Sequence, residues 1–255
     1  MDKKIGLFLQ GGGAKGSFQA GALSAMAEKE IKYQVISGTS IGAINGMILL
    51  YHKEKQLREL WEKMINGKYG KDMSAPVFET KEAILRLAEH VGTTRNSEIE
   101  HFYVNYLPVE KGRIWHEICD LCLQSDEKVY EYVSASSRLP NPGVWQSENK
   151  YSKDREGLFM EQIVKGLYDG YLLDGGLINN KFMEPLLQHD LDIIYAIVFE
   201  KEFVIPEYMA QKYRPEQIKV IKPDFVFGEM DTMNFTMESL EQWYQAGYKK
   251  AMEIL

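Results

Sequence analysis

Apolar residues occur along the chain in two alternating patterns, short continuous runs and runs with helical spacing. Residues 4–9 form a continuous run typical of a buried strand, and apolar positions in residues 18–26 then recur at the spacing of one helix face. A second strand at Val35-Ile36 leads into a helical pattern from Ile41, and residues 193–199 form a further apolar run. This alternation predicts an α/β fold, a three-layer α/β/α arrangement with a mainly parallel central sheet.

Between residues 52 and 112 the helical spacing persists and aromatic residues become frequent. The residues that recur at this spacing are Leu57, Leu60, Trp61, Met64, Ala83, Leu87, His90, Ile99, Phe102, Tyr103 and Tyr106. The chain shows no internal repeat and no linker long enough to divide it. We therefore predict a single domain over residues 1–255 with a helical, aromatic-rich insertion at about 52–112. An aromatic stripe of this kind is more typical of core packing than of a ligand wall.

The end of the chain predicts an amphipathic helix. Thr236 is a candidate N-cap, and one stripe then contains Leu240, Trp243, Tyr244, Gly247 and Tyr248. Such a stripe either packs against the fold or contacts lipid. Because Lys249-Lys250 is only a small basic patch, we expect the helix to close the back of the fold.

Three successive glycines follow the first predicted strand, in Gly11-Gly12-Gly13-Ala14-Lys15-Gly16. Glycine destabilises regular structure by roughly 0.5–1 kcal/mol relative to alanine, so this loop indicates backbone N–H groups that face a ligand or a transition state. Dinucleotide cradles and oxyanion holes both use such a loop. A dinucleotide site expects an acidic residue about 20 positions later, where this chain has Ser37-Gly38. The pattern therefore favours an oxyanion hole.

The second strand ends in Gly38-Thr39-Ser40-Ile41-Gly42, which puts one serine on a turn before a helix. A G-x-S-x-G elbow holds its serine in a strained turn, and the flanking glycines let other segments approach closely. The hydroxyl then lies at a helix N-terminus, where N–H groups and the helix dipole favour developing negative charge. The alternative is an ordinary turn with Thr39 or Ser40 as N-cap. The glycine-rich loop before it favours a nucleophile.

A serine nucleophile also needs a general base. Asp174 follows a predicted short strand at residues 171–173 and precedes Gly175-Gly176, although Asp-Gly between apolar runs is also a hairpin signal. A conventional α/β-hydrolase would need a histidine after this acid, and His189 is the only one that follows it. Since Ser40 comes after only the second strand and His189 precedes a strand in a polar pair, we predict that His189 is not catalytic.

Residues 11–16, residues 38–42, and residues 174–176 with Asn179-Asn180 together resemble the patatin-like phospholipases, in the order in which that family carries them. By this resemblance, Ser40 is the nucleophile and Asp174 the base of a dyad without histidine. The resemblance further implies a set of supporting glycines and one lysine. These are Gly11, Gly12 and Gly13 in the oxyanion hole, Lys15 and Gly16 in support of that loop, and Gly38 and Gly42 in the nucleophile elbow.

The implied function is a serine acyl hydrolase that cleaves lipid carboxylic esters, as a phospholipase A, a lysophospholipase or an esterase, through an acyl-enzyme intermediate. Its partner would be a lipid ester met transiently at a membrane or micelle surface, and no cofactor or metal is implied. A catalytically silent lipid-binding or regulatory protein of the same fold stays open, as does a dinucleotide-binding protein. The late Pro185 and the polar residues 146–155 depart from the family pattern and leave the substrate class open.

Charge and hydropathy restrict the partners. The formal net charge of −7 at pH 7 argues against nucleic-acid binding, for which a basic face would be expected, and against purely electrostatic adhesion to an anionic bilayer. The N-terminal apolar run is too short for a secretory signal, and the longest run, residues 41–51, is well short of a membrane span. We therefore expect a cytoplasmic protein.

The two cysteines, Cys119 and Cys122, form a single CxxC. One CxxC can be a redox pair or half of a zinc site, but no second pair completes four ligands. The neighbouring residues 114–118 alternate like a strand, in which positions three apart point to opposite faces. We expect reduced, structural thiols and no metal.

Overall fold

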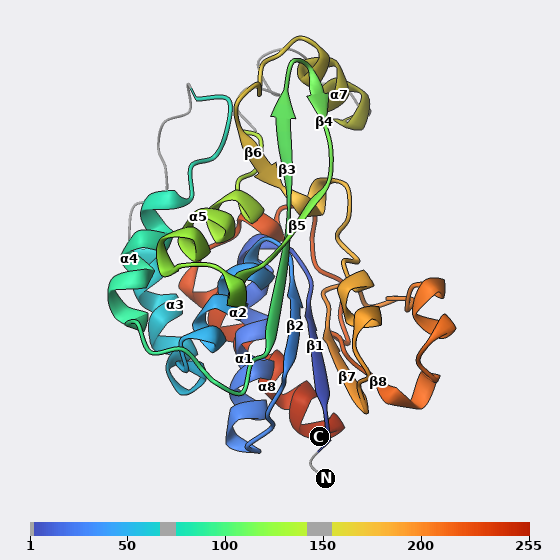
Figure 1. Cartoon of the computed structure of the whole chain (residues 1–255). Helices are drawn as coiled ribbons and strands as arrows, with labels where there is room; N and C mark the ends of the chain where they lie inside the picture. The colour runs from blue at the N-terminus through green and yellow to red at the C-terminus, as the bar shows by residue number, and fades with distance from the viewer. Residues whose placement is uncertain (1–2, 67–74, 142–154) are drawn as a thin grey trace.

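The computed structural model describes residues 3–66, 75–141 and 155–255, and Figure 1 shows its arrangement around one sheet. The polar run predicted at 146–155 falls almost entirely outside these residues. The strands are β1 (Ile5–Leu9), β2 (Val35–Gly38), β3 (His101–Glu110), β4 (Arg113–Ile114), β5 (Glu117–Asp120), β6 (Leu172–Asp174), β7 (Ile193–Ile197) and β8 (Ile218–Ile221). The α-helices are α1 (Gly16–Glu28), α2 (Ile41–Leu50), α3 (Leu57–Asn66), α4 (Lys81–Val91), α5 (Asp126–Ser136), α7 (Arg155–Val164) and α8 (Met237–Ile254).

The strand order in the sheet is β4-β3-β2-β1-β7-β8, and β5 and β6 also pair with β3. β1 is parallel to β2 and β7, β2 is parallel to β3, and β7 is parallel to β8. The partners β4, β5 and β6 run antiparallel to β3. The sheet is therefore mainly parallel, as predicted. In Figure 1, β3 extends beyond the other parallel strands toward β4, β6 and α7.

The two faces of the sheet are covered by different kinds of helix. On one face Leu7 packs with residues of α1, α2 and α8. On the other face Phe8 and Ile194 pack with residues of two 3-10 helices, η5 (Glu184–Gln188) and η6 (Glu207–Gln211). Consecutive residues of a strand point to opposite faces, so Leu7 and Phe8 each serve a different layer. The predicted layering is confirmed, with 3-10 helices in one of the two outer layers.

Helix α8 closes the fold by packing directly along α1. Gly21 of α1 lies against the carbonyl of Tyr244, and Gly247 of α8 lies against the carbonyl of Phe18. A Cβ atom at either glycine would collide with the facing oxygen. The two helix backbones approach this closely because glycine stands at both contact points. The packing role predicted for the C-terminal helix is confirmed.

The predicted helical insertion at about 52–112 is wrong in its last part. Helices α3 and α4 form where the spacing indicates, and residues 67–74 lie outside the described residues. Residues His101–Glu110, however, form the long strand β3. Phe102 packs in the core on one face and Tyr103 on the other. A strand that is buried on both faces does not alternate between apolar and polar residues. The spacing of its aromatic residues therefore matched that of a helix by coincidence.

Candidate active site

Ser40 occupies a strained turn between β2 and α2. Its φ of 56° and ψ of −122° put a non-glycine residue in the left-handed half of backbone space. Gly42 makes the turn sterically feasible, because a Cβ there would collide with the carbonyl of Leu9. The N–H of Ser40 donates to the hydroxyl of Ser136, at the end of α5, with 3.0 Å between N and Oγ. Both serines are buried, so the geometry of the elbow is held from a distant part of the chain.

Asp174 ends β6 and is fully enclosed by protein. Burial raises the pKa of its carboxyl to about 7, against the opposing effect of hydrogen bonds from the Ser40 hydroxyl and from the N–H of Gly176. The N–H of Gly176 lies 2.7 Å from Oδ1 of Asp174. The N–H of Asp174 donates to the carbonyl of Arg138 at 2.9 Å, which anchors the end of β6 to the residues after α5. A carboxyl group with this pKa and a serine hydroxyl on it can accept a proton near neutral pH.

The glycine-rich loop lies beside Ser40 and is held by Asn180. The N–H of Gly11 donates to Oδ1 of Asn180 at 2.9 Å, and Nδ2 of Asn180 donates to the Gly11 carbonyl at 3.1 Å. A Cβ at Gly11 would stand 3.1 Å from Cβ of Ser40, so the loop backbone contacts the elbow directly. Among the described residues, the N–H groups of Gly12 and Gly13 have no acceptor. These two groups are available to a ligand, whereas that of Gly11 is occupied.

These elements meet in one cavity of about 180 Å³. Its walls bring together Ser40, Asp174, the three glycines and Lys15, all of which the sequence indicated as site residues. The other lining residues are Leu139, Gly176, Leu177, Asn180 and Thr232. Gly16, Gly38 and Gly42 lie behind the cavity, where their missing side chains allow α1, α2 and β1 to pack closely.

Lys15 supplies the positive charge at this cavity. Its Nζ lies 5.7 Å from the ring centroid of Phe199 and 5.8 Å from that of Phe227, within cation–π range. Burial lowers the pKa of the ammonium group, and the charges of Asp231 and Glu200 partly oppose this shift. The lysine is thus held by aromatic rings at the wall of the cavity, and its placement there supports a role in shaping the loop.

Several contributors to the site have no local signal in the sequence. Thr232 covers Gly13, whose φ of 55° favours glycine and where a Cβ would collide with the Thr232 carbonyl. Ser136 ends α5 and Leu139 follows that helix, and no local pattern marks either residue as part of the site. Asn180 belongs to the motif around Asp174, but nothing in that motif signals its hydrogen-bond partner Gly11, which lies 169 positions away. Only the fold brings these residues to the cavity.

The family model for patatin-like phospholipases matches residues 7–187, which include the elbow, the glycine-rich loop and Asp174. The chain belongs to this family. A lysophospholipase, nte1 of Aspergillus terreus, is 27% identical over 211 residues, which cover 76% of this chain and 12% of that protein. The patatin-like phospholipase domain-containing protein 7 of Rattus norvegicus is 30% identical over 181 residues, covering 69% of this chain and 12% of that protein. The chain thus spans only about an eighth of these relatives.

A solved structure shows the same fold. VipD from Legionella pneumophila aligns with 99% of this patatin-like chain and 67% of its own chain, with a TM-score of 0.52 and 11% sequence identity. In the described residues, no helix combines the length and the apolar composition that crossing a bilayer requires.

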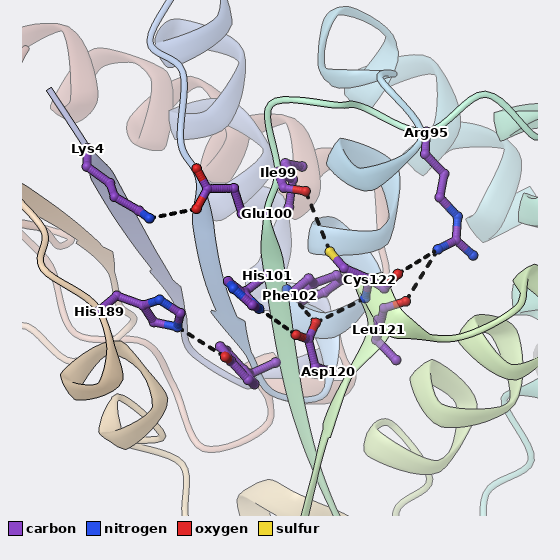
Figure 2. Close-up of polar contacts among 11 residues, drawn as sticks. Lys4, Arg95, Ile99, Glu100, His101, Phe102, Asp120, Leu121, Cys122 and His189 are labelled. Carbon is purple, nitrogen blue, oxygen red and sulfur yellow. Dashed lines mark hydrogen bonds and ion pairs between the residues drawn. The ribbon is translucent and has the colours of Figure 1, made fainter. Parts of the chain in front are cut away.

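The histidine that an α/β-hydrolase would use lies elsewhere in this patatin-like chain. Figure 2 shows His189 beside His101, with 4.6 Å between the ring centroids. His189 Nε2 is hydrogen-bonded to the Tyr103 hydroxyl at 3.0 Å, and His101 Nδ1 lies 2.6 Å from Asp120. His101 is paired with Val35 at the start of β2, whereas Ser40 follows the end of that strand. This cluster therefore belongs to the opposite end of the parallel strands.

The two cysteines are free thiols near this cluster. Cys119 lies on β5, and Cys122 Sγ is 3.7 Å from the carbonyl of Ile99 (Figure 2). Burial raises the pKa of Cys119 to about 11 and that of Cys122 to about 12, so neither is a reactive thiolate at neutral pH. Across the part of the chain that the structure describes, no three His, Cys, Asp or Glu side chains gather in a way that would hold a metal ion.

Proposed function

We propose that this protein hydrolyses lipid carboxylic esters, with Ser40 as nucleophile and Asp174 as general base. The observation that carries the proposal is the convergence of three features in one cavity. They are the hydrogen-bonded pair of Ser40 and Asp174, the raised pKa of the carboxyl group, and the unengaged N–H groups of Gly12 and Gly13. A nucleophile, a base and donors for an oxyanion are the complete set for acyl transfer.

The reaction follows in two halves. Ser40 Oγ attacks the ester carbonyl carbon while its proton passes to Asp174, and the N–H groups of Gly12 and Gly13 stabilise the oxyanion. The ester C–O bond then breaks, and the leaving alcohol takes the proton from Asp174. Water next attacks the acyl-enzyme and gives a proton to Asp174, the bond to Oγ breaks, and the proton returns to Ser40 as the fatty acid leaves. Each preorganised donor contributes about 2.7–4 kcal/mol in other acyl-transfer enzymes.

A lysophospholipid or another phospholipid ester is the substrate class that the names of the relatives support. The two relatives carry lysophospholipase and patatin-like phospholipase in their names. Leu139 and Leu177 provide apolar walls beside the dyad, as an acyl chain requires. Such substrates reside in membranes or micelles, so the proposal includes transient contact with a lipid surface.

Labelling with a fluorophosphonate probe, followed by mass spectrometric mapping, tests the nucleophile. We expect one adduct on Ser40, none in Ser40→Ala, and wild-type labelling in Ser24→Ala, which changes a serine on α1 outside the cavity. Fatty-acid release is then measured with lysophosphatidylcholine, diacyl phosphatidylcholine and a short-chain p-nitrophenyl ester. An adduct on a different serine, or no adduct on a folded protein, would overturn the assignment of Ser40.

A further inference from the structure

β2, which ends two residues before Ser40, and β6, which ends in Asp174, pair with neighbouring parts of β3. β2 pairs with β3 as far as Gly38, opposite Val104. β6 pairs with β3 from Asp174, opposite Tyr106. Residues 103, 104 and 106 of β3 also pair with β5. Because a strand residue has one partner on each side, β5 lies along one edge of β3, and β2 and β6 share the opposite edge. Asn105 is the single residue of β3 between the two pairings.

The side chain of Asn105 connects the segments on both sides of this junction. Asn105 is fully buried. Its Oδ1 accepts from the hydroxyl of Thr39 at 2.8 Å, and its Nδ2 donates to the carbonyl of Asn179 at 3.0 Å. Thr39 directly precedes Ser40. Gly175, directly after Asp174, packs so tightly on the Asn105 carboxamide that a Cβ there would collide with it.

Only a carboxamide matches these partners. The carbonyl of Asn179 can only accept, so the amino end of Asn105 must face it, and Oδ1 is then left for the Thr39 hydroxyl. Nδ2 also lies 3.2 Å from Nε2 of His116, a contact that suits a neutral imidazole with its proton on Nδ1. Burial lowers the pKa of His116, against the charges of Glu184 and Glu117, which favours that neutral form.

We propose that Asn105 is a positioning residue that sets the separation between the Ser40 hydroxyl and the Asp174 carboxyl. The inference rests on the proposed function of these two residues. Asn105 does not line the cavity, so it acts through Thr39 and Gly175 rather than on the substrate. Proton transfer from Ser40 to Asp174 depends steeply on their distance, and displacement of a reacting group by about 1 Å can lower a rate about 100-fold. Substrate binding depends on the cavity walls and should change little.

The test compares Asn105→Leu with Tyr213→Phe. Leucine has the same number and branching of side-chain heavy atoms as asparagine and removes all three hydrogen bonds. Tyr213→Phe removes a buried hydroxyl that donates to the carbonyls of Leu186 and His189, outside the cavity, and so serves as a control for loss of stability alone. For each folded variant, the thermal midpoint, kcat, KM and the rate of fluorophosphonate labelling are measured.

In Asn105→Leu we expect kcat and the labelling rate to fall together by about 100-fold, with KM within about threefold of the wild type. Tyr213→Phe should lower the thermal midpoint and leave kcat unchanged. A folded Asn105→Leu with kcat within twofold of the wild type would overturn the proposal, and so would a rise in KM at constant kcat. If the wild type itself takes no label on Ser40, the proposed function fails first, which separates the two ideas.

A milder variant decides the matter if Asn105→Leu does not fold. Thr39→Val keeps the shape of the side chain and removes only the hydroxyl that donates to Asn105. We expect kcat and labelling to fall by about 3- to 10-fold with KM unchanged, since one bond from the same carboxamide is lost. Thr39→Val with wild-type kcat would overturn the proposal.

Discussion

The side-chain amide of Asn180 makes two hydrogen bonds to the backbone of a single residue, Gly11. Oδ1 accepts from the Gly11 N–H at 2.9 Å, and Nδ2 donates to the Gly11 carbonyl at 3.1 Å. Asn180 belongs to the segment that follows Asp174, so this pair connects the segment of the proposed base with the glycine-rich loop. It also occupies one of the three loop N–H groups, which leaves those of Gly12 and Gly13 for the proposed oxyanion.

We expect Asn180→Ala to lower kcat by about 10- to 100-fold, because the glycine-rich loop loses both hydrogen bonds that orient its free N–H groups. Asn180→Asp should be at least as damaging, since it keeps the acceptor for the Gly11 N–H but sets a carboxylate oxygen against the Gly11 carbonyl. Steady-state kinetics with a soluble ester measure both. Asn96→Ala is the control. It removes an exposed hydrogen bond, from the N–H of Glu98 to the Asn96 side chain, and should retain wild-type kcat. Wild-type activity in Asn180→Ala would contradict the role of this pair.

The local elements of the site could be predicted from sequence because each is encoded within a few residues. The strand before Gly11, the turn at Ser40 and the strand before Asp174 all lie where the patterns indicate. Each depends on glycine at a tight turn or on an apolar run beside it, and both are visible locally. The family match then confirms the membership that these motifs suggested.

The tertiary contacts of the site could not be predicted in this way. Ser136 accepts the hydrogen bond of Ser40 from 96 positions away, and Asn105 reaches Thr39 across 66 positions. Nothing near either residue in the sequence signals its partner. The position of Asn105 in a strand was also hard to predict. β3 is buried on both faces, so the spacing of its apolar residues also matched that of a helix. A strand pairing, not a local pattern, gives this residue its place.

The rate of ester hydrolysis should depend on the ionisation of Asp174. Since burial raises the pKa of this carboxyl to about 7, the base is largely protonated in mildly acidic solution. We expect kcat/KM, which reports the ionisation of the free enzyme, to fall about tenfold per pH unit below 7 and to level off above it. The labelling rate of Ser40 should follow the same curve. A profile that stays flat down to pH 5 would show that Asp174 is not the group that accepts the proton.

Asp174→Asn should abolish most activity and stabilise the protein at neutral and alkaline pH. The folded-state pKa is raised from 3.8 to about 7, so the wild type loses stability as pH rises through this range, by on the order of 4 kcal/mol. Asparagine is neutral throughout and can still accept from the Gly176 N–H. The difference in free energy of unfolding should therefore be small at pH 4, grow to pH 7 and then level off. Denaturant unfolding at several pH values measures it, and an equal difference at pH 4 and pH 8 would contradict the assignment.

His189→Gln should leave ester hydrolysis within about twofold of the wild type, because His189 lies with His101 and Tyr103 away from the cavity. Burial lowers the pKa of His189, and the nearby His101 and Lys4 lower it further. A lowered pKa stabilises the fold above the ordinary value of 6.5, and this contribution is lost as pH falls below it. Glutamine cannot be protonated, so the variant should lose less stability between pH 7 and pH 5. Loss of activity in a folded variant would contradict the two-residue dyad.

Gly247→Ala should destabilise the protein although alanine is the better helix former. In an open helix this substitution would stabilise by about 1 kcal/mol. Here the new Cβ would collide with the carbonyl of Phe18, which belongs to a helix backbone and cannot rotate away. Helices α1 and α8 would have to separate along their whole contact, which typically costs about 1–3 kcal/mol and lowers the thermal midpoint by several degrees.

Gln242→Ala, at an exposed position of the same helix, is the control and should be neutral or slightly stabilising. Because neither Gly247 nor Phe18 lines the cavity, folded Gly247→Ala should keep its labelling rate at Ser40. An unchanged midpoint would mean that the two helices have room to adjust, and the close approach would then not be what holds α8 in place.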